Sequence, residues 1–221
     1  MMFSATMPKA MAELFGHYLD KPIRAEASPP GKVADKVSHS VHFVSKDQKQ
    51  DLLIELLDGH RDDRALVFSR TKHGAERLMQ QLDRAGIAAT SIHGNKSQGQ
   101  RDLAIAEFKD GSVRVLVATD VAARGIDIPS VGHVYNYDLP IVPENYVHRI
   151  GCTARAGRDG RAVTFCAADE VSELKAIENV LGVRVDIAGG RAWEGIGNAP
   201  KAKKRRQPRR RSSRHPERIA A

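Results

Sequence analysis

Hydrophobic and polar positions alternate with two different periods between about residues 37 and 180. The stretch VSHSVHFV places Val37, His39, Val41 and Phe43 on one face, and this period of two is typical of a half-buried strand. The next stretch, DQKQDLLIELLDG, spaces its leucines as an amphipathic helix does. The same pattern continues along the chain, with further short strands expected at 65–69, 89–93, 113–118, 132–138 and 161–167.

Helical patterns separate these strands. Apolar residues at helical spacing run from Ala75 to Ala85, and a second stripe passes through Leu103, Ala104 and Phe108. Strand–helix alternation of this kind predicts an α/β fold, with right-handed crossovers and a parallel sheet covered on both faces. The remaining helices are expected at 143–150, where proline opens the segment, at 171–181, and separately at 8–19.

Polar clusters follow three of the expected strands. SRTK comes after 65–69, HGNKSQGQR after 89–93 and TDVAARGID after 113–118. Ligands of parallel α/β folds bind outside the carboxyl ends of the strands, in the connecting loops. These clusters are therefore the candidate site.

The net charge of +8 is concentrated at the carboxyl terminus. Residues 201–221 hold ten of the 35 Lys and Arg residues and one acid, which leaves 25 basic and 26 acidic residues elsewhere. Because this tail has almost no apolar residues and two prolines, we expect it to be disordered. It is either a solubilising tail or an arm that contacts nucleic-acid phosphates without sequence preference.

Composition excludes several classes of protein. No apolar run approaches the roughly 18 residues of a membrane span, and MMFSATMPKA lacks the features of a signal peptide, so we expect no membrane association. Cys152 and Cys166 form no CxxC pair, which argues against a disulfide scaffold or a zinc site and favours the reducing cytoplasm. No ligand set accompanies His93 or His148, so the sequence predicts no metal site.

Residues 148–158, HRIGCTARAGR, bring Arg149, Arg155 and Arg158 into one short segment. Three guanidiniums this close repel one another unless an anion joins them, and their planar forks match phosphate oxygens. Cys152, in the middle of the run, cannot contact a phosphate in this way. The segment is a candidate phosphate site in which one position does not fit.

Six segments in order resemble the motifs of the DEAD-box RNA helicases: SAT (4–6), VFSRTK (67–72), HGNKSQGQR (93–101), VLVATDVAARGIDIP (115–129), YNYDLP (135–140) and HRIGCTARAGR (148–158). RTKHGA and IHGNKSQ look most similar to the bacterial RhlE-type branch. Such enzymes have two RecA-like domains that close on ATP and one RNA strand. The resemblance implies a remnant of the first domain, a linker, a RecA-like three-layer sandwich and a basic tail, at 1–25, 26–36, 37–187 and 188–221.

The resemblance implies the carboxyl-terminal half of an ATP-dependent RNA helicase. The chain contains neither GxxxxGK[ST], the loop that cradles nucleotide phosphates, nor Asp-Glu-Ala-Asp. We therefore expect no ATP hydrolysis by this chain alone, with ATP and Mg²⁺ held mainly by a first domain. The expected partners are RNA and ribosomal or RNA-decay assemblies. The alternative is a non-catalytic RNA-binding or annealing module.

Residue roles follow from the same resemblance. It implies three groups of site residues: RNA-backbone contacts at Thr71, Gly94, Arg101 and Thr119; nucleotide contacts at Gly125, Asp127, Arg155 and Arg158; and coupling between domains at Ser4, Thr6 and Arg149. Some of these residues have simpler explanations. Thr71 suits a helix N-cap, Arg101 a solvated helix position, and Asp120 and Asp127 suit caps or turns.

The last motif departs from its family at two positions. The family pattern reads HRIGRTGRAGR, so Cys152 replaces an arginine that reaches the γ-phosphate and Ala154 replaces a glycine. Arg155 remains as the candidate arginine finger, a group that contributes about 10³–10⁵ in rate. The two replacements put catalysis by a complete enzyme in question.

Overall fold

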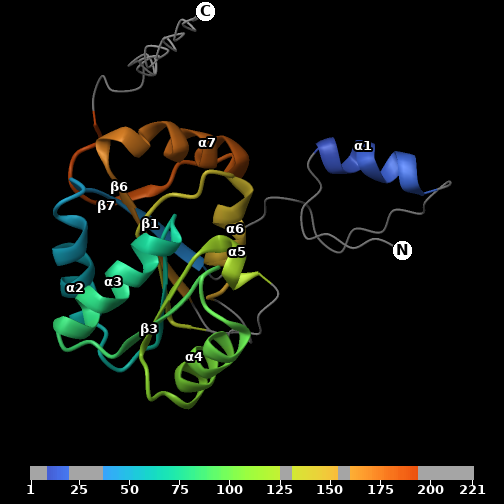
Figure 1. The fold of residues 1–221 in the computed structure, drawn as a ribbon. Coiled ribbons are helices and arrows are strands. Elements are labelled where there is room, and N and C mark those ends of the chain that lie inside the picture. Colours follow the sequence, from blue (N-terminus) through green and yellow to red (C-terminus); the bar gives the residue numbers. More distant parts are fainter. Residues whose placement is uncertain (1–8, 20–36, 125–130, 154–159, 194–221) are drawn as a thin grey trace, which may run out of the picture.

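The structure, a computed structural model, describes residues 9–19, 37–124, 131–153 and 160–193. Seven strands form one sheet in the order β3-β4-β2-β5-β6-β1-β7, and every neighbouring pair is parallel. Figure 1 shows helices packed against the sheet. The strands are β1 (Val37–Phe43), β2 (Ala65–Phe68), β3 (Ala89–Ile92), β4 (Val115–Ala118), β5 (His133–Asn136), β6 (Gly160–Cys166) and β7 (Asp186–Gly189).

Helices connect the strands, as parallel pairing requires. Caps explain where several of them begin: Thr71 caps α3, and Ser97 with Gln100 forms a capping box on α4. The helices are α1 (Lys9–Tyr18), α2 (Lys49–Asp58), α3 (Lys72–Arg84), α4 (Gln98–Asp110), α5 (Asp120–Ala123), α6 (Glu144–Ile150), the 3₁₀ turn η1 (Ala168–Glu170) and α7 (Val171–Leu181).

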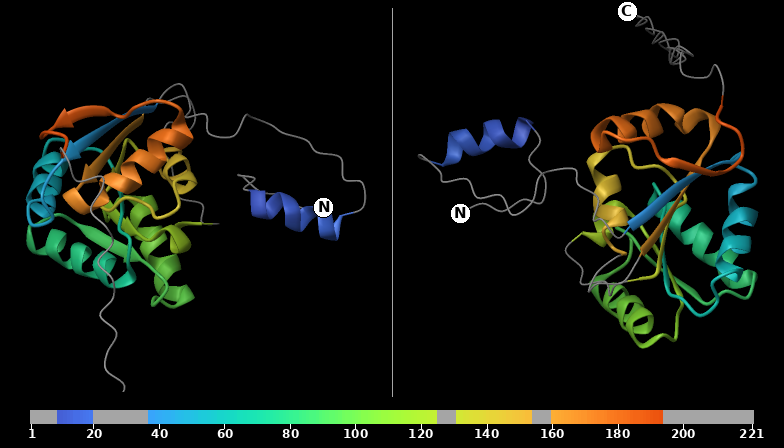
Figure 2. Two further views of the ribbon diagram at one scale, coloured as in Figure 1. Left: turned by 90° about the horizontal axis from the view of Figure 1, so that it is seen from above. Right: turned by 180° about the vertical axis from the view of Figure 1, so that it is seen from behind.

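The core has two layers, one on each face of the sheet. Successive residues of β2 point to opposite faces, so Leu66 and Phe68 pack in one layer while Ala65 and Val67 pack in the other. The first layer lies under α4, α6 and α7, and the second lies under α2 and α3. Figure 2 shows this three-layer arrangement from two further directions. The predicted α/β fold with a doubly covered parallel sheet is confirmed.

Four details differ from the sequence prediction. Strand β7 was not predicted, and it pairs with β1 across the domain boundary expected at residue 187. The ordered packing continues to Trp193, whose indole Nε1 donates to the Cys166 carbonyl at 3.1 Å. The short helix α5 was also not predicted, and Leu103, assigned to the apolar stripe of α4, is 59% exposed.

Strand β7 gives little sequence signal because its side chains face solvent. Its contribution comes from backbone pairing, which any residue can make. Gly190 follows the strand directly with a φ of +74°, and a Cβ added there would collide with the Phe43 carbonyl oxygen. Only glycine allows this backbone approach.

None of the helices that the structure describes combines the length and the hydropathy of a membrane-spanning segment.

Candidate functional site

The polar clusters meet at one edge of the sheet. Phe68, Ala118 and Ile92 end β2, β4 and β3, and the register places Ala118 beside both other residues. The segments that follow these strands therefore begin side by side at the carboxyl edge. This edge, defined by residues 69–71, 93–97 and 119–120, is the candidate RNA surface.

Thr71 lies on the exposed part of this edge. Its hydroxyl accepts a hydrogen bond from the Gly74 backbone N–H at 2.9 Å, so it caps α3. The N-cap explanation is therefore confirmed. Accepting this bond leaves the hydroxyl proton available to a ligand oxygen.

A network of charged groups anchors the loop that carries Thr71. Asp138 accepts from the Ser69 hydroxyl at 3.0 Å and from the Arg70 backbone N–H at 2.9 Å. Glu170, 3% exposed, accepts from the Arg70 guanidinium at 2.9 Å and from the Lys49 ammonium at 2.5 Å. Sequence reasoning missed Lys49, in α2, and Glu170, in the 3₁₀ turn η1, because charged residues normally face solvent.

Glu76 holds the segment before Gly94. Its carboxylate accepts from the Ser91 hydroxyl at 2.6 Å, lies 3.0 Å from His93 Nε2, and pairs with Lys96. Burial opposes ionisation of Glu76, but these hydrogen bonds together lower its pKa to about 2. Gly94 follows this anchored residue, is exposed, and has no atom within 4 Å of where a Cβ would stand. A ligand can therefore approach its backbone.

Arg101 lies in the first turn of α4, and its side chain reaches α5. One terminal nitrogen donates to the Ala122 carbonyl at 3.1 Å, and the other makes a 3.4 Å contact with Gln98. The Nε atom is buried without a partner among the described residues. The guanidinium is thus held next to the carboxyl edge, with donor capacity that these contacts leave unused.

Thr119 and Asp120 begin α5 directly after β4. The Thr119 side chain makes no capping hydrogen bond, and the residue is 8% exposed. Asp120 accepts two hydrogen bonds from Arg149, from Nε at 2.6 Å and from a terminal nitrogen at 2.9 Å. This bidentate pair fixes the start of α5 against α6.

Arg149 is 2% exposed, so its guanidinium belongs to the interior of the domain. Besides Asp120 it donates to Asn136 at 3.1 Å and to the Asp138 carbonyl at 2.7 Å. It also lies 4.8 Å from the ring centroid of Phe68. The geometry gives Arg149 a positioning role within this domain. Coupling between domains stays a prediction for this residue. Because Arg149 is buried, it would act on another domain only through the residues to which it donates hydrogen bonds.

The last motif approaches the amino end of the sheet. The Val131 backbone N–H donates to the Cys152 carbonyl at 3.4 Å, which brings this motif next to the segment that leads into β5. Cys152 is half-buried, and its Sγ lies 3.5 Å from the His148 carbonyl oxygen. Ala154, which stands where the family pattern has glycine, lies outside the described residues. The same holds for the other residues assigned to nucleotide contacts or to coupling between domains: Ser4, Thr6, Gly125, Asp127, Arg155 and Arg158.

One cluster of potential metal ligands lies in the described residues. Mg²⁺ prefers oxygen ligands in octahedral geometry. In the part of the chain that the structure describes, one group of three such side chains has its ligand atoms close together, namely His60, Asp63 and His133, which offers two nitrogens and one carboxylate. This cluster therefore does not suit Mg²⁺.

Comparison with known proteins identifies the domain. Residues 48–157 match the model of the helicase conserved C-terminal domain. The chain is 41% identical over 186 residues to the DEAD-box ATP-dependent RNA helicase CshA of Bacillus subtilis, covering 84% of this chain and 38% of that protein. CshA of Listeria monocytogenes is 39% identical over 194 residues, covering 88% and 37%. The chain thus spans under two-fifths of the length of these relatives.

Solved structures agree with this match. The E. coli DEAD-box protein SrmB, bound to regulator of ribonuclease activity A, superposes with a TM-score of 0.67 at 36% identity, covering 76% of this chain and 99% of that one. S. cerevisiae Dbp5 bound to RNA and ADP BeF3 superposes with a TM-score of 0.77 at 31% identity, covering 85% and 50%. The RhlE-type branch stays a prediction. The fold, the motifs and these matches show that the chain belongs to the DEAD-box RNA helicases, of which it carries the C-terminal RecA-like domain.

Proposed function

We propose that this chain supplies the C-terminal half of an ATP-dependent RNA helicase, contributing RNA-backbone contacts and an arginine finger. The observation that carries the proposal is the meeting of Thr71, Gly94 and Thr119, which follow three different strands, at one carboxyl edge. Dbp5, a structural neighbour, has been solved with RNA and ADP BeF3. A structural neighbour that binds RNA supports RNA as the ligand proposed for this chain.

The chemistry of this edge suits a sugar–phosphate backbone. A hydroxyl, an open glycine backbone and the Arg101 guanidinium can each bond phosphate or ribose oxygens, and none of them reads a base edge. We therefore expect little sequence preference and a preference for RNA over DNA through the 2′-hydroxyl groups.

The nucleotide side of the proposal rests on the motif residues. Gly125, Asp127, Arg155 and Arg158 would contact ATP, while the phosphate loop and the Mg²⁺ ligands would come from a first RecA-like domain. Ribosomal or RNA-decay assemblies are the proposed partners. The cytoplasm is the proposed compartment, since the sequence has no CxxC pair that would indicate a disulfide scaffold. Cys152 favours the second candidate, a non-catalytic RNA-binding module, because it removes a phosphate-binding charge.

Replacing Arg101 with glutamine is expected to weaken binding of single-stranded RNA roughly threefold to tenfold, because one phosphate contact is lost. The slope of log K against log salt should become shallower by about 0.7. Fluorescence anisotropy with a labelled RNA measures both quantities. Arg184→Gln is the matched control, since Arg184 is exposed and precedes β7 at the opposite end of the sheet. Equal affinities for the Arg101 variant and the parent chain would contradict the assignment.

Deleting residues 201–221 is expected to weaken RNA binding much more at low salt than at high salt. The segment carries ten basic residues and one acid, and its contacts would release counterions. The same titrations over a range of KCl concentrations measure the effect. If the salt slope is unchanged by the deletion, the segment is a solubilising tail and not a nucleic-acid arm.

A further inference from the structure

Two histidines and an aspartate meet at the amino end of the sheet, opposite the candidate RNA surface. His60 lies in the turn after α2, Asp63 ends the same turn, and His133 is the first residue of β5. Their ligand-capable atoms all lie within 4.8 Å of one another. Among the described residues, no second group of three or more His, Cys, Asp or Glu side chains meets this condition.

The fold holds the three residues in place. The Asp63 backbone N–H donates to the His60 carbonyl at 3.1 Å, which closes the turn. The same carbonyl accepts from the Arg114 guanidinium at 2.8 Å. The rings of His60 and His133 stack with centroids 4.0 Å apart, and His133 Nε2 lies 3.1 Å from an Asp63 carboxylate oxygen. His133 itself is 5% exposed, so its position is fixed by the sheet.

Gly132 allows the carboxylate to come this close. A Cβ added to Gly132 would lie 3.3 Å from Asp63 Cγ, which is tighter than most real contacts of this kind. The glycine backbone is in turn fixed, because its carbonyl accepts from the Arg161 backbone N–H at 3.0 Å. The absence of a side chain at residue 132 therefore leaves the space that Asp63 uses.

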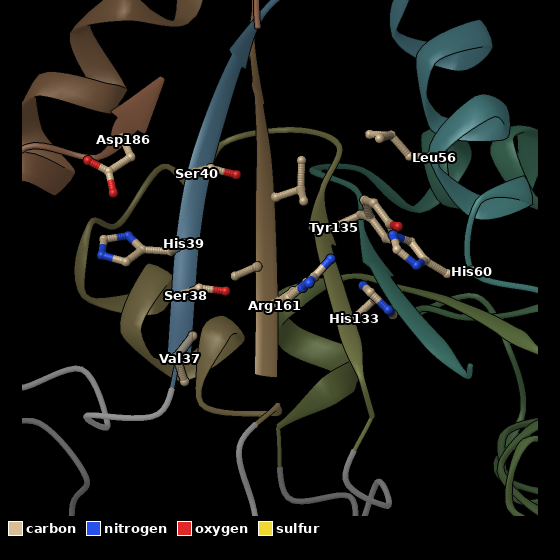
Figure 3. Close-up of a pocket in the computed structure, with 12 residues that line it drawn as sticks. Val37, Ser38, His39, Ser40, Leu56, His60, His133, Tyr135, Arg161 and Asp186 are labelled. Carbon is tan, nitrogen blue, oxygen red and sulfur yellow. The ribbon is translucent and has the colours of Figure 1, made fainter. Parts of the chain in front are cut away.

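A pocket of about 550 Å³ opens beside the two histidines. Figure 3 shows His60 and His133 close together on one side of it, with the Arg161 side chain extending from β6 towards them. The pocket gives an ion a route from solvent and leaves room for water in further coordination positions. Arg161 also lines the pocket, and its positive charge opposes binding of a cation.

We propose that His60, Asp63 and His133 form a binding site for a divalent transition-metal ion, with solvent in the remaining coordination positions. Two imidazole nitrogens and one carboxylate suit Zn²⁺, Ni²⁺ or Co²⁺ and not Mg²⁺ or Ca²⁺. Metal–ligand bonds of about 2.0–2.2 Å require the ligand atoms to draw closer than 4.8 Å. The Asp63 carboxylate already lies 3.1 Å from His133 Nε2, and its 58% exposure leaves it room to shift towards an ion. The rings of His60 and His133 are stacked at 22°, so their lone pairs do not converge, and the half-buried His60 ring must tilt for both nitrogens to reach the same ion. Because Arg161 opposes the ion, we expect a micromolar dissociation constant.

A bound ion would connect the turn after α2 to the start of β5. Because this arrangement exists only in the folded chain, binding should stabilise the fold in proportion to metal concentration. Thermal unfolding of the full chain is expected to shift upward by several degrees with excess ZnCl₂, and MgCl₂ at the same concentration should produce no shift. Calorimetric titration should give one Zn²⁺ per chain.

The test uses variants at the two ligands that lie outside the sheet. His60→Ala and Asp63→Asn are each expected to weaken Zn²⁺ binding at least tenfold, while His73→Ala, which changes an exposed histidine on α3, should leave it unchanged. With Co²⁺ as the probe, the visible absorption of the bound ion should be lost in both ligand variants. Absence of stoichiometric binding, or equal affinities for the parent chain and His60→Ala, would overturn the proposal.

Discussion

Replacing Arg149 with methionine is expected to lower the free energy of unfolding by about 3–5 kcal/mol, the range for breaking a buried ion pair by removing one partner. Methionine fills much of the volume but leaves the Asp120 carboxylate without its bidentate partner. Asn136 and the Asp138 carbonyl lose their donors at the same time. Urea unfolding followed by circular dichroism measures the change, and the slope of the transition shows whether it stays two-state.

A double-mutant cycle separates the ion pair from the loss of packing. Asp120→Asn alone should cost less, because Asp120 is 23% exposed and the amide oxygen still accepts from Arg149. Adding it to Arg149→Met should cost little more, since the unpaired charge is then gone. Arg184→Met, an exposed position, should stay within about 0.5 kcal/mol of the parent. A loss below about 1 kcal/mol for Arg149→Met would contradict the pair's role, because a buried pair broken on one side costs more than this.

The sequence predicted the elements that bury side chains in the core. Leu66 and Phe68 belong to an apolar run, and the leucines of α2 follow helical spacing, so both signals are local. Strand β7 was missed because it is held by backbone pairing to β1 and buries little. The periodicity of apolar residues indicates which side chains are buried, so it gives no signal for an edge strand whose side chains are exposed.

The candidate site was predicted residue by residue, but its supports were not. The resemblance of the motifs assigns Thr71 and Thr119 to one RNA-binding surface. The parallel pairing of β2 with β4 brings the segments that carry them together. The partners that position them are long-range: Lys49 reaches Glu170 across 121 positions, and Arg149 reaches Asp120 across 29. The His60–His133 cluster is of the same type. Such pairs depend on sheet order and register, which local patterns do not encode.

Replacing Cys152 with arginine is expected to raise the rate of RNA-stimulated ATP hydrolysis at least tenfold in a polypeptide that joins this chain to a complete first RecA-like domain. A donor aimed at charge that develops in the transition state contributes about 10²–10³ in rate, and the motif lacks one such donor at residue 152. Cys152 follows the end of α6, is half-buried and packs against the core, so the added side chain must leave this packing to reach a phosphate. Steady-state ATPase at saturating RNA measures the change.

Cys152→Gln separates charge from size, because glutamine is long and polar but carries no charge. If the introduced arginine acts on the γ-phosphate, the glutamine variant should hydrolyse ATP at close to the parent rate. The higher rate of the arginine variant should then come mainly from a higher kcat. A contact that arises only in the closed two-domain state should leave RNA binding by the single chain almost unchanged. Equal rates for the parent polypeptide and its Cys152→Arg variant would show that this position is off the phosphate path. The motif would then act through Arg155 alone, and the non-catalytic interpretation of the chain would lose its main support, since Cys152 would no longer mark a missing catalytic group.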